Sequence, residues 1–87
     1  MDPTALRVRT SLIQFVVRSF NVQEDEINLD ESLIQQGIID SFGLVELTVF
    51  IEKELGVEVR QEDMTLEAFG SVNKMARFVA ARLESST

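Results

Sequence analysis

The chain has 87 residues, of which 45% are hydrophobic and 26% charged, and its formal net charge is −7. This length predicts one domain with a modest core, and the composition is too apolar for a disordered chain. The negative charge argues against nucleic acid and anionic membrane surfaces as binding partners. No apolar run approaches a membrane span, and the opening residues hold no signal-peptide core. We expect a cytoplasmic monomer that begins at Met1, although a domain cut from a longer chain would read the same way.

Cysteine and histidine are both absent from the sequence. Without cysteine there is no disulfide, no thiolate metal site and no thiol redox chemistry. Without histidine the chain lacks the commonest general base and zinc ligand, and it cannot assemble a Ser-His-Asp triad. A self-sufficient hydrolase is therefore disfavoured, and a reactive serine would have to be activated by another protein.

Acidic residues gather in the middle of the chain. Residues 24–67 hold thirteen Asp and Glu residues but only two basic ones, Lys53 and Arg60. Such a cluster is usually a solvated face, and it can also be a docking surface that attracts basic partners. The acidic segment 24–31 fails the EF-hand pattern, because no register supplies the glycine required at its sixth position. We expect no metal site.

The first predicted element is a helix over about residues 3–20. Asp2 and Pro3 form an N-cap followed by proline at the first helical position, and Asn21 is a plausible stop. Apolar residues recur on one face of this helix: Leu6, Leu12, Ile13, Val16, Val17 and Phe20. We expect that face to pack on the core.

Residues 21–40 form a long connection, which in a small domain must either pack against the core or take part in the function. Within it, the stretch 29–37 is compatible with one helical turn. Five apolar residues are expected to pin the connection to the core: Ile27, Leu29, Leu33, Ile34 and Ile38.

A second helix is predicted over about residues 41–55, with Asp40 as N-cap and Gly56 as a left-handed stop. On a helical wheel it carries two apolar stripes. The core stripe consists of Leu44, Leu47, Ile51 and Leu55. The second stripe, on nearly the opposite side, consists of Phe42, Val45 and Val49, bordered by Glu46, Glu52 and Lys53. Because a surface helix needs only one apolar face, the second stripe either packs under Ile38 or Ile39 or stays exposed for a partner.

Two further helices complete the prediction. A short third helix over about residues 63–69 is capped by Asp63 or Thr65, and a fourth over about residues 71–84 is capped by Ser71. The apolar face of the fourth consists of Val72, Met75, Ala76, Val79, Ala80 and Leu83. No stretch shows the alternation of a strand. The predicted fold is all-α, a small antiparallel four-helix bundle with one short member.

The stretch GIIDSFGLVELTVFIEKELGVEV, residues 37–59, closely resembles the acyl carrier protein family. The family's hallmark is an Asp-Ser-Leu triplet that opens the second helix, and here the triplet is Asp40-Ser41-Phe42. The flanking stretches LDESLIQQG and FGSVNKMARFV are similar to the family's motifs, as is Gly56 followed by VEV. The resemblance covers nearly the whole chain and implies a carrier protein rather than an enzyme.

The resemblance implies that Ser41 is esterified by a 4′-phosphopantetheine arm taken from coenzyme A, whose thiol then carries an acyl group as a thioester. It also implies that Asp40 helps the phosphopantetheinyl transferase to recognise the site. A phosphodiester at Ser41 is favoured physically, because free backbone N–H groups and the dipole at a helix start stabilise an anion. The alternative is an unmodified helical interaction module, in which Ser41 is only a hydroxyl at a helix start.

The resemblance further implies two groups of contact residues. Those facing partner enzymes are Phe42, Val45, Glu46, Val49 and Glu52. Those bounding a sleeve for the cargo are Leu47, Ile51, Val59, Ala68 and Val72, for which core packing is the other interpretation. The expected partners are an acyl- or aminoacyl-loading ligase or synthase and downstream transferases.

Three departures from the family pattern bear on the cargo. Phe42 stands where leucine is commoner, and Lys53 interrupts the usual acidic run. Gly43 replaces an acid often found in fatty-acid carriers and lowers helix propensity by about 1 kcal/mol relative to alanine. The stretch DSFG is also similar to carriers of amino acids, including the D-alanine carrier of cell-wall modification. We expect a specialised bacterial pathway, fatty-acid-like or polyketide-like, and favour acyl over aminoacyl cargo.

Overall fold

The computed structural model describes residues 1–85 and builds them into helices joined by loops. The α-helices are α1 (Pro3–Phe20), α2 (Ser41–Glu54), α3 (Leu66–Phe69) and α4 (Val72–Ser85). Two single 3-10 turns, Glu24–Glu26 and Gln61–Asp63, precede α2 and α3. No strand occurs within this described range. The predicted all-α fold is confirmed.

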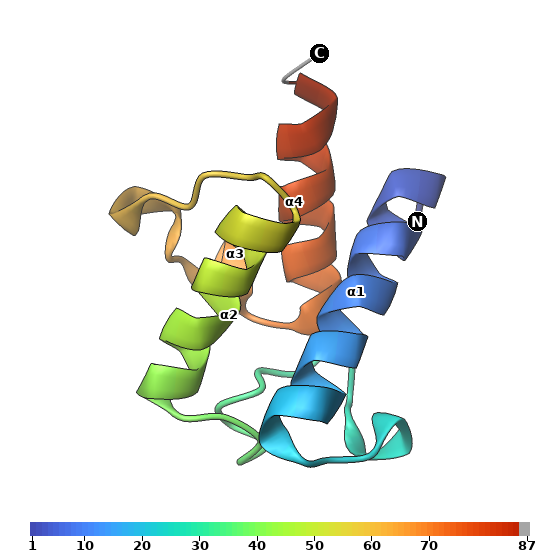
Figure 1. Cartoon of the computed structure of the whole chain (residues 1–87), viewed down its shortest axis with the longest axis vertical. Helices are drawn as coiled ribbons and strands as arrows, with labels where there is room; N and C mark the ends of the chain where they lie inside the picture. Colours follow the sequence, from blue (N-terminus) through green and yellow to red (C-terminus); the bar gives the residue numbers. More distant parts are fainter. Residues whose placement is uncertain (86–87) are drawn as a thin grey trace.

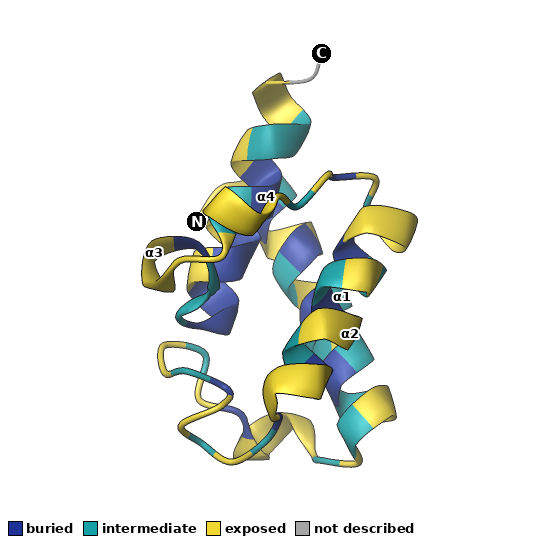
Figure 2. Ribbon diagram, turned by 90° about the vertical axis from the view of Figure 1, so that its left-hand side faces the viewer, coloured by how far each residue is buried: buried dark blue, intermediate teal, exposed yellow. Residues whose placement is uncertain are grey.

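The three long helices pack around one core. In Figure 1, α1 runs opposite to both α2 and α4, and residues 21–40 cross one end of the bundle. The links around α3 lead the chain back alongside α2, so that α2 and α4 point in the same direction. The largest fully buried apolar side chains come from all three long helices: Leu12, Val16, Leu47, Ile51, Val72, Met75 and Val79. Figure 2 shows buried stretches, coloured dark blue, on all three long helices.

Local side-chain caps define where the long helices begin and end. The Asp2 carboxylate accepts the backbone N–H of Ala5 at 2.8 Å, and Asn21 ends α1 in the left-handed conformation. The Ser71 hydroxyl accepts the backbone N–H of Lys74 at 3.0 Å. The caps at Asp2 and Ser71 agree with the sequence prediction. In each, the capping side chain and the N–H that it binds are only three residues apart, so a short motif reveals them.

The helix boundaries near α2 and α3 differ from the prediction. The last residue of α2 is Glu54, one residue earlier than expected, before Gly56 turns with a φ of 72°. The predicted helix over residues 63–69 is interrupted at Met64, whose ψ of 71° is not helical. Thr65 then caps α3 by accepting the backbone N–H of Ala68 at 3.2 Å.

The 3-10 turn ends at Asp63, whose carboxylate is bound by groups that lie before and after it in the chain. It accepts the backbone N–H of Arg60 at 2.9 Å and the guanidinium of Arg82 at 2.6 Å. The Arg60 N–H, together with the nearby Arg82 charge, holds the pKa of Asp63 below its ordinary value. The link before α3 is thereby tied to α4 rather than continued as helix.

Two apolar side chains predicted to face the core are exposed instead. The buried residues of α1 are Ala5, Val8, Leu12 and Val16. Leu6 lies about 100° from Ala5 around this helix and is 41% exposed. Ile34, in the turn at residues 33–37, is 46% exposed, whereas the adjacent Leu33 is buried. Most of the predicted loop anchors do pack on the core.

The acidic segment that follows α1 is solvated. Its Asp and Glu residues at positions 24–31 are exposed, and Glu26 accepts the backbone N–H of Gln23 at 2.9 Å. Across residues 1–85, no group of three or more acidic side chains is arranged to hold a metal ion. Over the same range, no helix has both the length and the apolar character needed to cross a bilayer.

Candidate functional site

Ser41 is the first residue of α2, and its side chain is exposed. The preceding Asp40 caps the helix by accepting the backbone N–H of Gly43 at 2.9 Å through its Oδ1. In the described part of the chain, no hydrogen bond is found to the Ser41 hydroxyl or to the backbone N–H groups of Ser41 and Phe42. A free hydroxyl and two free donors therefore meet at the positive end of the helix dipole, which suits a phosphate ester.

The start of α2 approaches α1 closely at Gly43, a role that the sequence analysis missed. A Cβ atom at this position would lie 2.8 Å from the Ile39 Cβ and 3.0 Å from a ring carbon of Phe20. Such spacings leave no room for an alanine methyl group, and still less for an acid. The sequence did hold a signal for this contact. A glycine inside a helix lowers helix propensity, so its presence there points to a packing reason.

The two apolar stripes of α2 differ in burial. Leu47 and Ile51 are fully buried in the core stripe, and Leu44 and Leu55 are partly buried. The exposed fractions in the second stripe are 79% for Phe42, 57% for Val45 and 40% for Val49. Neither Ile38 nor Ile39 covers Phe42, so the exposed interpretation of this second stripe is the correct one. We call Phe42, Val45 and Val49 the outer stripe, and in Figure 2 much of the α2 ribbon is coloured as exposed.

Two acidic residues predicted to contact partners border the outer stripe. Glu46 and Glu52 are both exposed. Glu52 also has a structural contact, because its Oε2 accepts the backbone N–H of Val59 at 3.0 Å and ties α2 to the link before α3. No hydrogen bond or ion pair of the Glu46 side chain is found within residues 1–85. The two acids are therefore distinguishable by mutation.

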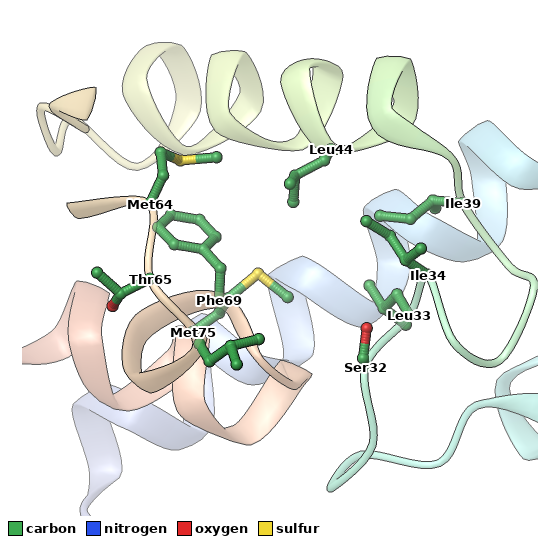
Figure 3. A pocket seen from close by; sticks show the side chains of 10 residues that line it. Ser32, Leu33, Ile34, Ile39, Leu44, Met64, Thr65, Phe69 and Met75 are labelled. Atoms are coloured by element: carbon green, nitrogen blue, oxygen red, sulfur yellow. The ribbon is translucent and has the colours of Figure 1, made fainter. Parts of the chain in front are cut away.

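A cavity of about 200 Å³ lies between the loop before α2, α2 itself, α3 and α4 (Figure 3). It is lined by Ser32, Leu33, Ile34, Ile39, Leu44, Met64, Thr65, Leu66, Phe69 and Met75. In Figure 3, Leu44 points into this space from α2, while Phe69 and Met75 approach it from the opposite side. Because Ile39 and Leu44 flank Ser41 in the sequence, the cavity lies beside the start of α2.

None of the five predicted sleeve residues lines this cavity. Leu47, Ile51 and Val72 are fully buried in the core, Ala68 is buried, and Val59 packs partly buried against the core. The cavity instead uses Leu44 and Met75, each three residues from a predicted position, and Phe69, next to Ala68. The five positions came from the family resemblance, and four of them lie on α2, α3 and α4, which also line the cavity. The sleeve role of the five residues stays a prediction.

Comparisons with known proteins agree with this geometry. Residues 10–79 match the family described as phosphopantetheine attachment site. The acyl carrier protein of Petrotoga mobilis is 34% identical over 70 residues, which are 80% of this chain and 80% of that protein. The acyl carrier protein of Clostridium perfringens is 30% identical over 73 residues, or 84% and 93% of the two chains. The D-alanyl carrier protein of Enterococcus faecalis is 36% identical over 59 residues, or 66% and 76%.

The family match identifies the cofactor and the class of protein. Phosphopantetheine is the group that such domains carry, and the proteins themselves are carriers rather than enzymes. Carriers of this kind work with a phosphopantetheinyl transferase and with biosynthetic enzymes. The matched region covers most of the chain, including the whole of α2 and α3. This chain therefore belongs to the acyl carrier protein family.

Proposed function

We propose that the phosphopantetheine arm is attached to Ser41, and that residues 1–87 form one carrier domain that presents thioester-bound cargo to partner enzymes. The observation that carries this proposal is the exposed, unpaired Ser41 hydroxyl at the first turn of α2. The free backbone N–H groups of Ser41 and Phe42 would stabilise the diester. When bound, the arm supplies the thiol that a chain without cysteine lacks.

The surroundings of Ser41 suit docking of the transferase and later partners. The cap uses Oδ1 of Asp40, and its Oδ2 remains available to a basic group of the transferase. The outer stripe offers apolar contact area, and Glu46 and Glu52 border it with negative charge. These features support the predicted partner surface, and the cytoplasmic location expected from the sequence belongs to the same proposal.

The cavity beside Ser41 supports acyl cargo. An apolar cavity of about 150 Å³ holds benzene, so a volume of about 200 Å³ corresponds to roughly eight carbon atoms. The lining is mostly aliphatic and aromatic, and its only polar side chains are Ser32 and Thr65. An aminoacyl group would bring an ammonium ion to a lining without a carboxylate, and an unpaired buried charge is strongly unfavourable. A fatty-acid-like or polyketide-like pathway fits this cargo.

A D-alanine-type carrier is the second candidate. It is supported by the 36% identity to the D-alanyl carrier protein of Enterococcus faecalis and by the resemblance of the DSFG stretch to carriers of amino acids. In that case the small cargo would stay outside the cavity, with its ammonium group in water. The two candidates differ in whether the cargo stabilises the fold.

The attachment proposal is tested by intact mass after incubation with coenzyme A, Mg²⁺ and a phosphopantetheinyl transferase of broad specificity. We expect wild type and the matched control Ser19→Ala, which alters another exposed serine, to gain one arm. Ser41→Ala should gain none while its circular dichroism and thermal unfolding stay unchanged. If the wild type also gains nothing beside an active transferase control, the unmodified interaction module replaces the carrier proposal for this chain.

The cargo proposal is tested by loading the arm with acetyl, octanoyl or D-alanyl groups and measuring thermal unfolding. We expect the octanoyl form to have the highest Tm, because its chain fills apolar space that is otherwise empty. The acetyl and D-alanyl forms should unfold like the protein bearing the arm alone. Equal Tm values for all three would favour a cargo held outside the cavity.

A further inference from the structure

Residues 28–36 of the loop before α2 fold into a closed unit, which we call the loop unit. The Gln36 side chain joins its two ends, since Oε1 accepts the backbone N–H of Asn28 and Nε2 donates to the Asn28 carbonyl, both at 2.8 Å. The same Nε2 also donates to the carbonyl of Glu31 at 2.9 Å. A segment whose ends and middle are held by one side chain is expected to move as a whole.

Asn73, near the start of α4, makes all of the hydrogen bonds found in residues 1–85 between the loop unit and a helix. Its backbone N–H donates to the Leu29 carbonyl at 3.0 Å, and its Nδ2 donates to Oδ1 of Asp30 at 2.7 Å. Its Oδ1 accepts from the Arg9 guanidinium of α1 at 3.1 Å. Asn73 is only 9% exposed. A buried amide with both ends paired is a strong geometric constraint, because an unpaired group there is costly.

The loop unit forms one wall of the cavity. Three of its residues, Ser32, Leu33 and Ile34, line that wall (Figure 3). The Leu33 carbonyl also accepts the backbone N–H groups of Ile38 and Ile39, at 3.0 and 3.4 Å. The opposite wall belongs to α2, α3 and α4. A displacement of the loop unit therefore changes the width of the cavity directly.

We propose that Asn73 is a positioning residue that, through Leu29 and Asp30, sets the width of the cavity and so the length of cargo that it accepts. With these bonds made, the wall is fixed and the cavity suits a chain of roughly eight carbons. With them broken, the loop unit swings outward and longer chains fit. The part concerning cargo rests on the proposed function, whereas the bonds themselves belong to the protein without its arm.

Hydrogen exchange in the protein without its arm tests whether Asp30 holds the loop unit. Asp30→Ala is compared with Glu31→Ala, a neighbouring exposed acid whose loss changes the charge equally, and with Asp30→Asn, whose amide oxygen still accepts a bond. The reporters are the backbone N–H of Asn73, bonded to Leu29, and that of Gln36, bonded to Ser32 inside the loop unit at 3.0 Å.

In this exchange experiment, we expect Asp30→Ala to accelerate exchange at Asn73 by about tenfold, the effect of losing one charge-assisted bond, and to leave Gln36 unchanged. Glu31→Ala should behave like wild type, and Asp30→Asn should restore most of the protection. An unchanged rate at Asn73, or equal acceleration at both reporters, would overturn the proposal.

The effect on cargo is measured with acyl chains of increasing length on the arm. In wild type and Glu31→Ala, the Tm gain should peak near the eight-carbon chain, and in Asp30→Ala the peak should move to longer chains. A uniform loss of Tm at every length would mean that Asp30 is merely structural and would overturn the positioning role. If no variant accepts the arm, the proposed function fails, while the exchange rates still decide whether the loop unit is held.

Discussion

The two faces of α2 carry similar side chains in opposite surroundings. On the inner face, Leu47 and Ile51 are fully buried and Gly43 lies against α1. On the outer face, Phe42 and its neighbours in the outer stripe are exposed. Hydrophobicity alone therefore does not reveal which face stabilises the fold. The inner face is constrained by packing, whereas contact with partners is the role that we propose for the outer stripe.

The largest expected effect on the inner face is that of Leu47→Ala. Removing this fully buried side chain should lower the free energy of unfolding by about 2–5 kcal/mol, the usual range for a leucine cavity in a core. Ile51→Ala should fall in the same range. Urea unfolding measures both, with Val49→Ala on the outer face as the control. Equal losses at positions 47 and 49 would contradict the assignment of the two faces.

Gly43→Ala examines the close approach between α1 and α2. The new methyl group would clash with Ile39 and Phe20, and overpacking of this kind lowers stability by about 1–3 kcal/mol. Higher helix propensity offsets about 1 kcal/mol of that loss. We therefore expect a net loss of about 1–2 kcal/mol in urea unfolding. A stabilised variant would mean that the helices separate at little cost.

Glu52→Ala tests whether an acid at the border of the outer face also stabilises the fold. It removes the hydrogen bond to the Val59 backbone, and we expect a loss of about 0.5–1 kcal/mol in the free energy of unfolding. Glu46→Ala is the matched control and should leave stability within about 0.5 kcal/mol of wild type. Similar losses in both variants would show that the contact with Val59 contributes little.

Val45→Ala should have the smallest effect on stability. Because 57% of Val45 is exposed, we expect a change within about 0.5 kcal/mol. Its effect should appear instead with a partner, as a roughly fivefold fall in kcat/KM of the phosphopantetheinyl transferase, equivalent to about 1 kcal/mol at an interface. An unchanged kcat/KM would remove Val45 from the proposed partner surface.

Prediction from the sequence worked best where the determining contacts are local. The caps at Asp2, Asp40 and Ser71 each bind a backbone N–H three residues away, so they are visible as short motifs. The stripes of α2 followed from helical periodicity, but which stripe is covered did not. The sequence left both Asp63 and Thr65 as caps of the third helix, because the bond from Arg82 to Asp63, nineteen residues apart, is invisible in a local pattern; the cap is Thr65.

The sequence by itself determined the three long helices, their N-caps, the two stripes of α2 and the serine at its start, because period and cap chemistry act within a few residues. Only the tertiary structure decided that Gly43 is a contact point, which residues line the cavity, and that Asn73 holds the loop unit. Asn73 joins Asp30 and Arg9 across 43 and 64 residues. Contacts of that range depend on how whole helices are rotated and packed, which no stretch of sequence specifies alone.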